Sequence, residues 1–244
     1  MSLRVFAPEA GADLEPGRLL ELDKDETHYL KRVRRARDGQ ELELLDGVRH
    51  RYRAHIAPGL ADAKRARLQL LERLPTAPDS PHRTLLLGQI DKGPALEALT
   101  DAVVMGVHEL AWVECARSQG RSPSDDRIER AIRAAQRQCG RPDRPRLHNF
   151  PSLEAALDAE FPGPLLWASL ADPPESEAPT PAHLNAPLRL AIGPEGGFDP
   201  DEVALLRKRG ALPVQIGPWV LRSERAVVAA LARLFVGGSR PPSP

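Results

Sequence analysis

The chain has 244 residues, which is enough for one large domain or two modest ones. Its 34 basic and 34 acidic residues cancel, so the net charge by itself does not suggest a nucleic-acid partner. Two cysteines, without a Cys-x-x-Cys pair or a histidine cluster, argue against a disulfide framework and a zinc site, and we expect no metal. No apolar run approaches the ~20 residues of a membrane helix, and the N-terminus lacks a signal-peptide core, so we expect a cytoplasmic protein with no membrane partner.

The first third of the chain predicts a small β-rich domain. Short strand-like runs bounded by turn residues lie at 4–6, 41–45, 51–56 and 67–72, with one helix at 27–35. Their close spacing is typical of a barrel. Prolines at 75, 78 and 81 interrupt the polar stretch that follows, so we place a linker at 75–82, after a domain of residues 1–74.

After this linker, strands and helices alternate. We expect strands at 84–88, 109–115, 165–170, 188–192 and 214–216, and helices at 93–105, 125–139, from 199 onward, and at 223–235. The alternation predicts an α/β domain over 83–244, with a mostly parallel sheet and helices on both faces. The proline-rich stretch 171–187 predicts a long surface loop.

A glycine-rich bend connects the strand at 188–192 to the next helix. The residues Gly-Pro-Glu-Gly-Gly (193–197) are followed at once by Asp199, Pro200 and Glu202, which form a helix start with a capping box. Glycines leave the main chain bare at a strand–helix junction, where α/β proteins commonly bind ligands. Neither GxGxxG nor GK[ST] is present, so this is not a dinucleotide or phosphate loop of the usual kind. A tight connection without a ligand stays the alternative.

A second bend repeats this arrangement. The strand at 214–216 leads into Gly217-Pro218 and a helix that we expect Ser223 to cap. Arg222 and Glu224 lie where this helix begins, and that pair beside a glycine turn favours a functional site. The alternatives are that Arg222 is solvated and that Glu224 complements the helix dipole.

The segments IGPEGGF (192–198) and IGPWVLRSERA (216–226) resemble the RsmE-type 16S rRNA uracil-N3 methyltransferases of the SPOUT class. The resemblance extends to 28–47, 91–110 and 134–141. It implies a PUA-like RNA-binding β domain, an α/β domain with a C-terminal trefoil knot, S-adenosylmethionine as cofactor, 16S rRNA of the small ribosomal subunit as substrate, and a homodimer. The chain departs from the family pattern at Trp219, where an arginine is usual, at Arg225 in place of a threonine, and at Asp101 in place of a lysine.

By this resemblance the cofactor lies against the main chain of both bends. The residues implied to bind it are Leu170, Ile192, Gly193, Glu195, Gly196, Gly197, Ile216, Gly217 and Leu221. The N3 atom of uridine must lose a proton before it can be methylated, and negative charge then develops on the uracil oxygens. Our hypothesis is that Arg222 stabilises this charge and that Glu224 or a water takes the proton, since a guanidinium stays protonated.

Arginines gather in two places in spite of the zero net charge. Over 125–139 they form a stripe opposite the apolar residues Ile128, Ile132, Ala135 and Cys139, which predicts an exposed basic ridge and a buried face. A second group lies within 31–37. Ordinary solvation is the alternative to RNA contact, which would be salt-dependent. The predicted RNA-binding residues are Arg32, Arg34, Arg35, Arg127, Arg130, Arg133, Arg137 and Arg141.

Two other functions stay open at this point. One is a SPOUT RNA methyltransferase that acts on the ribose 2′-oxygen, and the other is a non-catalytic RNA-binding relative. Mass spectrometry of nucleosides separates the first from a uracil methyltransferase, and calorimetry with S-adenosylmethionine separates the second.

Overall fold

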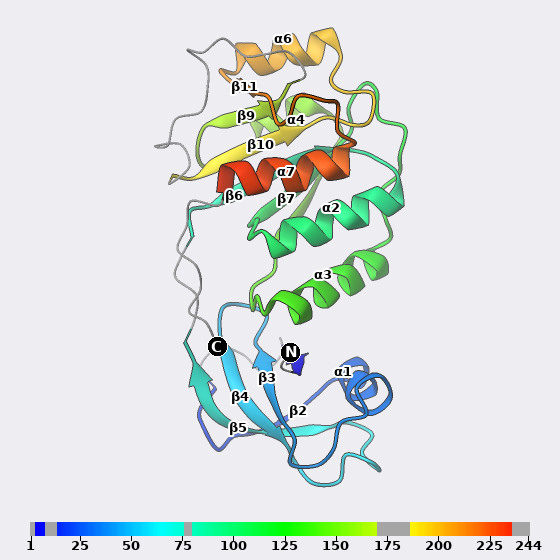
Figure 1. The fold of residues 1–244 in the computed structure, drawn as a ribbon, viewed down its shortest axis with the longest axis vertical. Coiled ribbons are helices and arrows are strands. Elements are labelled where there is room, and N and C mark those ends of the chain that lie inside the picture. Colours follow the sequence, from blue (N-terminus) through cyan, green and yellow to red (C-terminus); the bar gives the residue numbers. More distant parts are fainter. Residues whose placement is uncertain (1–2, 8–13, 76–79, 170–185, 236–244) are drawn as a thin grey trace. The chain divides into compact units, whose positions relative to one another are not determined.

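The computed structural model describes residues 3–7, 14–75, 80–169 and 186–235 (Figure 1). The chain divides into two units, one of residues 1–77 with 136–144 and the other of residues 78–135 with 145–244. The domain boundary that we expect at 75–82 stays a prediction, and residues 76–79 lie outside the described part. Most of the expected surface loop at 171–187 also lies outside it.

A curled five-stranded sheet forms the first unit, in the order β1-β3-β4-β5-β2. β1 runs parallel to β3, and the other neighbours are antiparallel. In β4 every second residue is buried, including Tyr52 and Ile56, so one face of the sheet encloses an apolar core. The strands are β1 (Arg4–Phe6), β2 (Leu19–Glu21), β3 (Glu41–Leu45), β4 (Arg51–Ile56) and β5 (Arg67–Leu74).

The helix of this unit begins three residues earlier than its sequence pattern predicts. Asp23 accepts a hydrogen bond from the Glu26 amide at 2.6 Å and so caps α1 (Lys24–His28). The helix continues as a π-helical turn, Tyr29–Val33, and Arg35 then takes a left-handed backbone conformation with φ of 49°. Left-handed backbone cannot continue a right-handed helix, so the chain leaves the helix here.

The second unit is built on a six-stranded sheet in the order β11-β9-β10-β6-β7-β8. Each neighbouring pair is parallel, which confirms the predicted parallel α/β architecture. The trefoil knot stays a prediction. The strands are β6 (Arg83–Gly88), β7 (Glu109–Val113), β8 (Arg146–Phe150), β9 (Leu165–Ala168), β10 (Leu188–Ile192) and β11 (Leu212–Val214).

Helices cover both faces of this sheet. Residues such as Leu85 and Leu87 of β6 point to one face, where α2, α3 and α7 pack, and Leu86 points to the other, with α4 and α6. In Figure 1, α2 and α7 lie side by side on the first face. Burial on both faces explains why β6 reads as a continuous apolar run. The helices are α2 (Lys92–Val104), α3 (Asp125–Cys139), α4 (Leu153–Asp158), α6 (Pro200–Lys208) and α7 (Ser223–Phe235).

Further elements differ from the sequence prediction, among them β2, which has no counterpart in the expected strands. β11 ends at Val214 rather than Ile216, because its partner β9 ends at Ala168. β8 was not predicted, since it is an edge strand without the alternation or apolar run that marks a strand. α4 was also missed, although Ser152 caps it by accepting a hydrogen bond from the Ala155 amide at 3.1 Å.

Within the described ranges, no helix has both the length and the apolar character needed to cross a membrane. In the same part of the chain, no group of three or more histidine, cysteine, aspartate or glutamate side chains is placed to hold a metal ion.

Candidate functional site

The first bend is a tight turn that ends in a capped helix. The Gly197 amide donates to the Pro194 carbonyl at 2.8 Å, and Gly197 has a φ of 68°, which favours glycine. Asp199 and Glu202 then form the predicted capping box, with amide-to-carboxylate distances of 2.7 and 2.9 Å. This reciprocal pair fixes the direction in which the chain leaves the bend.

The end of β6 packs directly against this bend. A side-chain carbon at Gly88 would lie 2.5 Å from the Pro194 ring, closer than atoms can approach, so only glycine fits. Sequence reasoning did not single out Gly88. The available signal was a glycine at the end of a buried strand in a parallel sheet, the edge where ligands usually bind.

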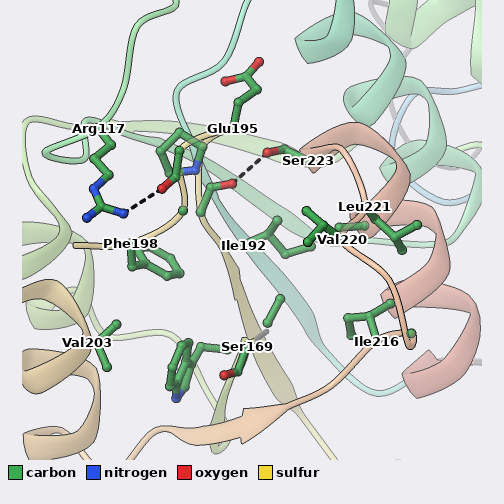
Figure 2. A pocket seen from close by; sticks show the side chains of 18 of the residues that line it. Arg117, Ser169, Ile192, Glu195, Phe198, Val203, Ile216, Val220, Leu221 and Ser223 are labelled. Atoms are coloured by element: carbon green, nitrogen blue, oxygen red, sulfur yellow. Dashed lines mark hydrogen bonds between the residues drawn. The ribbon is translucent and has the colours of Figure 1, made fainter. Parts of the chain in front are cut away.

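The second bend lies beside the first and is hydrogen-bonded to it. The Ser223 hydroxyl donates to the Gly193 carbonyl at 2.9 Å (Figure 2). The prediction that Ser223 caps α7 is therefore wrong, because Ser223 is the first residue of the helix and uses its hydroxyl to contact the other bend. The Arg222 carbonyl instead accepts the first helical bond, from Ala226 at 2.8 Å.

A cavity of about 410 Å³ lies between the two bends. All predicted cofactor residues that the structure describes line it, whereas Leu170 lies outside the described part. Figure 2 shows the Glu195 carboxylate pointing away from the other labelled side chains, so Glu195 contributes to the wall through its main chain. The predicted residues in the wall are Ile192, Gly193, Glu195, Gly196, Gly197, Ile216, Gly217 and Leu221.

The two predicted catalytic residues lie beyond this wall. Neither Arg222 nor Glu224 lines the cavity. Arg222 is exposed and has no ion pair among the described residues, while Glu224 is only 5% exposed at the start of α7. The cations that do line the cavity are Arg117 and Arg207, which sequence reasoning did not select.

Arg117 contacts the first bend through Gly196. Its guanidinium donates to the Gly196 carbonyl at 2.9 Å, and its aliphatic stem packs against Gly196, where an added side-chain carbon would meet it at 3.1 Å. The neighbouring Cys115 is buried close to Glu202. Burial is the main cause that raises the pKa of its thiol far above the ordinary value, and the negative charge of Glu202 adds to it. Cys115 therefore stays protonated and cannot act as a nucleophile.

Comparison with known proteins decides the family. The RNA methyltransferase domain family matches residues 78–235, and the RNA methyltransferase PUA domain family matches residues 22–63. This chain belongs to the RNA methyltransferases. The prediction of an RNA methyltransferase with a PUA-like β domain is thus confirmed.

Individual relatives of this RNA methyltransferase span nearly its whole length. The ribosomal RNA small subunit methyltransferase E of Mycobacterium bovis is 29% identical over 93% of this chain and 89% of its own. A Legionella pneumophila protein solved with the bound cofactor SAM is 25% identical, with a TM-score of 0.82 over 96% of this chain and 97% of its own. The ribosomal RNA small subunit methyltransferase E of Neisseria gonorrhoeae, solved bound to S-adenosyl methionine, is 24% identical with a TM-score of 0.83 over 96% of each chain and shares the fold.

The predicted arginine ridge of this methyltransferase is only partly exposed. Arg127 and Arg130 face solvent, and Arg133 is half-buried and bonded to Glu129 at 2.8 Å. The prediction of exposure is wrong for Arg137, which pairs with the buried Glu26, and for Arg141, which bonds to Asp143 at 2.6 Å. Both partners lie outside the helix, so the helical pattern alone could not reveal them.

The second basic segment is exposed. Arg32, Arg34 and Arg35 all face solvent. A hollow of about 620 Å³ lies beside them, lined by Arg32 and Arg35 together with Lys31, Arg37 and the apolar Leu60 and Ala61. Asp38 also lines it, but accepts hydrogen bonds from the Gly59 and Leu60 amides, which lower the pKa of its carboxyl. We call Lys31, Arg32, Arg34, Arg35 and Arg37 the basic surface.

Proposed function

We propose that this protein transfers a methyl group from S-adenosylmethionine to N3 of a uridine in 16S rRNA of the small ribosomal subunit. The single observation that carries the proposal is the bond between Ser223 and the Gly193 carbonyl, which brings two distant bends to one cavity. Relatives named ribosomal RNA small subunit methyltransferase E, and solved structures with the cofactor bound, support the choice of donor and substrate.

The cavity suits a small cofactor. Its volume of about 410 Å³ falls in the range of pockets that bind drug-sized ligands. Apolar side chains such as Ile192 and Ile216 alternate with bare glycine backbone in its wall. Apolar surface can cover the faces of an adenine ring, and exposed main-chain groups can bond to its polar edge.

Methylation at N3 needs both deprotonation and alignment. The donor methyl has to lie in line with the nitrogen, and much of the rate can come from that positioning. We propose that Arg222 stabilises the negative charge on the uracil oxygens, because its guanidinium is exposed and has no ion pair among the described residues. Glu224, which is buried two residues further on, or a water then accepts the proton.

The substrate contacts follow from the exposed cations. We propose that Arg32, Arg34 and Arg35 of the basic surface bind RNA phosphates together with the exposed Arg127 and Arg130 of α3 and the half-buried Arg133. We also propose a homodimer, as the family resemblance implies, and a location in the cytoplasm with the small subunit. Light scattering at micromolar concentration tests the dimer, since the mass of a single chain would contradict it.

The decisive experiment uses small ribosomal subunits from a strain that lacks the modification. After incubation with the protein and S-adenosylmethionine, we expect 3-methyluridine at one position of 16S rRNA, identified by mass spectrometry and mapped by primer extension. A 2′-O-methylated nucleoside would show that the enzyme acts on ribose, and cofactor binding without any methylation would indicate a non-catalytic role. Arg222→Ala should lower turnover at unchanged cofactor affinity; full turnover would exclude the role proposed for Arg222.

A further inference from the structure

The loop before α7 exposes apolar side chains to solvent. Trp219 is 83% exposed, Val220 is 74% exposed and Leu221 is 39% exposed. The two other tryptophans, Trp112 and Trp167, are buried in the sheet layer of the second unit. Trp219 has no stacking partner among the described residues. A bare indole ring on a surface loop is a candidate for ligand contact.

Trp219 lies where the cavity opens. It lines the cavity between the bends, yet most of its own surface faces solvent, so it is a rim residue and not part of the inner wall. Val220 and Leu221, from the same loop, also line the cavity, and Figure 2 shows Val220 next to Ile192. A methyl acceptor that meets a donor inside the cavity has to enter past such a rim.

The charges around this rim suit a nucleotide. Arg117 and Arg207 line the cavity, and the exposed Arg222 follows Trp219 by three residues. Among the described residues of the wall, Glu195 is the single acidic one, and its carboxylate points away. An aromatic ring next to guanidinium groups is the combination with which proteins hold unpaired nucleotides, since the ring stacks on the base and the cations attract phosphate.

We propose that Trp219 is the stacking platform for the base of the nucleotide that is methylated. This role for Trp219 rests on the proposed function. The resembling family carries an arginine at the same position. Stacking holds the unpaired base at the rim, with the edge that carries the acceptor nitrogen turned into the cavity. In this proposal the indole ring contacts the RNA, whereas the main chain of the two bends binds the methyl donor.

The test compares Trp219→Ala with Trp219→Phe, which keeps an aromatic face. With unmodified small subunits as substrate, we expect Trp219→Ala to raise KM about 10-fold with a smaller change in kcat, and Trp219→Phe to stay within about 3-fold of the wild type. The dissociation constant for S-adenosylmethionine, measured by calorimetry, should be unchanged in both. Because Trp219 is the exposed tryptophan, a short oligouridine should quench the fluorescence of the wild type and leave that of Trp219→Phe unquenched.

Several outcomes would overturn the proposal. An unchanged KM in Trp219→Ala, with 3-methyluridine still formed by the wild type, would refute the stacking role and leave the proposed function intact. A 10-fold loss of donor affinity would place the ring in the donor site, and a change in mass by light scattering would place it between two copies of the chain. Absence of 3-methyluridine with the wild type would instead refute the function itself.

Discussion

The Arg137 guanidinium lies over the ring of Tyr29, with its central carbon 4.2 Å from the ring centroid, and donates to the Glu26 carboxylate. Glu26 is fully buried and also accepts a hydrogen bond from the Phe6 amide at 3.2 Å. Burial raises the pKa of Glu26 above its ordinary 4.5, and the charge of Arg137 opposes that rise. The arginine is therefore a structural partner of a buried carboxylate, and its predicted contact with RNA stays a prediction.

We predict that Arg137→Met destabilises the protein by about 3 kcal/mol at neutral pH, because it leaves Glu26 buried without its cation. The loss should grow once the pH rises above the pKa that Glu26 has in the folded wild type, which burial holds above 4.5. Without Arg137 the pKa of Glu26 rises further, so the folded state binds a proton that the unfolded chain has released, and stability falls until the pH exceeds the raised pKa. Urea unfolding of both proteins across a pH series measures this difference.

Arg130→Met is the matched control, since Arg130 lies on the same helix and is exposed. Its free energy of unfolding should stay within about 0.5 kcal/mol of the wild type at every pH. An Arg137→Met loss that is the same at pH 5 and pH 8 would show that the carboxylate does not drive the effect.

At the scale of elements, an ion pair joins two helices of the second unit at positions where the chain departs from the resembling family. Arg225 of α7 bonds to Glu97 of α2 at 3.2 Å, and Asp101 lies in the same region, where Arg225 lowers its pKa against the larger effect of burial. Arg225 therefore replaces a threonine of the family in the same region where Asp101 replaces a lysine. The two departures compensate each other electrostatically, so they concern helix packing more directly than they concern the cavity.

The bond between the two bends can be tested by Ser223→Ala. We expect the dissociation constant for S-adenosylmethionine to rise about 5-fold, because a net hydrogen bond contributes about 1 kcal/mol and this one holds both walls of the cavity together. Calorimetry measures the affinity, and urea unfolding measures the accompanying loss of stability.

Ser152→Ala separates these two effects. Ser152 caps α4, outside the cavity wall, and its removal should cost about 1 kcal/mol of stability with unchanged donor affinity. Equal affinity losses in both variants would mean that general destabilisation, and not the bond to Gly193, controls binding.

At the scale of the whole molecule, zero net charge conceals a segregated charge distribution. The basic surface of the first unit is exposed around a hollow, whereas residues 150–206 include Arg189 as their one base. Local fields of this kind attract RNA phosphates although the molecule as a whole is neutral.

We predict that changing Arg32 and Arg35 to glutamine weakens RNA binding at low salt and reduces the steepness of its salt dependence. For single-stranded RNA each lost phosphate contact lowers the slope of log K against log salt by about 0.7, so two contacts lower it by about 1.4. Filter binding to 16S rRNA at several salt concentrations gives both quantities.

The same charge change at Arg53 and Arg65 provides the control. These two arginines lie in the same unit but pair with Glu72 and Glu21 at the surface, so their loss should alter the slope much less. If both double variants changed the slope equally, RNA binding would depend on total charge and not on the basic surface.

The periodic features of this protein can be predicted from its amino-acid sequence. β3, β4, β10, α3 and α7 begin and end where their patterns predict, and the capping box of Asp199 and Glu202 forms as expected. These features depend on neighbours within a few residues, so helical and strand periodicity is sufficient to reveal them.

The contacts between distant residues, by contrast, depend on the folded chain. β8 becomes a strand because β7 pairs with it, Ser223 reaches a carbonyl 30 positions away, and Arg137 finds its carboxylate 111 positions away. Such partners are chosen by the path of the chain through the fold, and a pattern along one helix or strand carries no information about that path. The cavity between the two bends is a product of those long-range contacts.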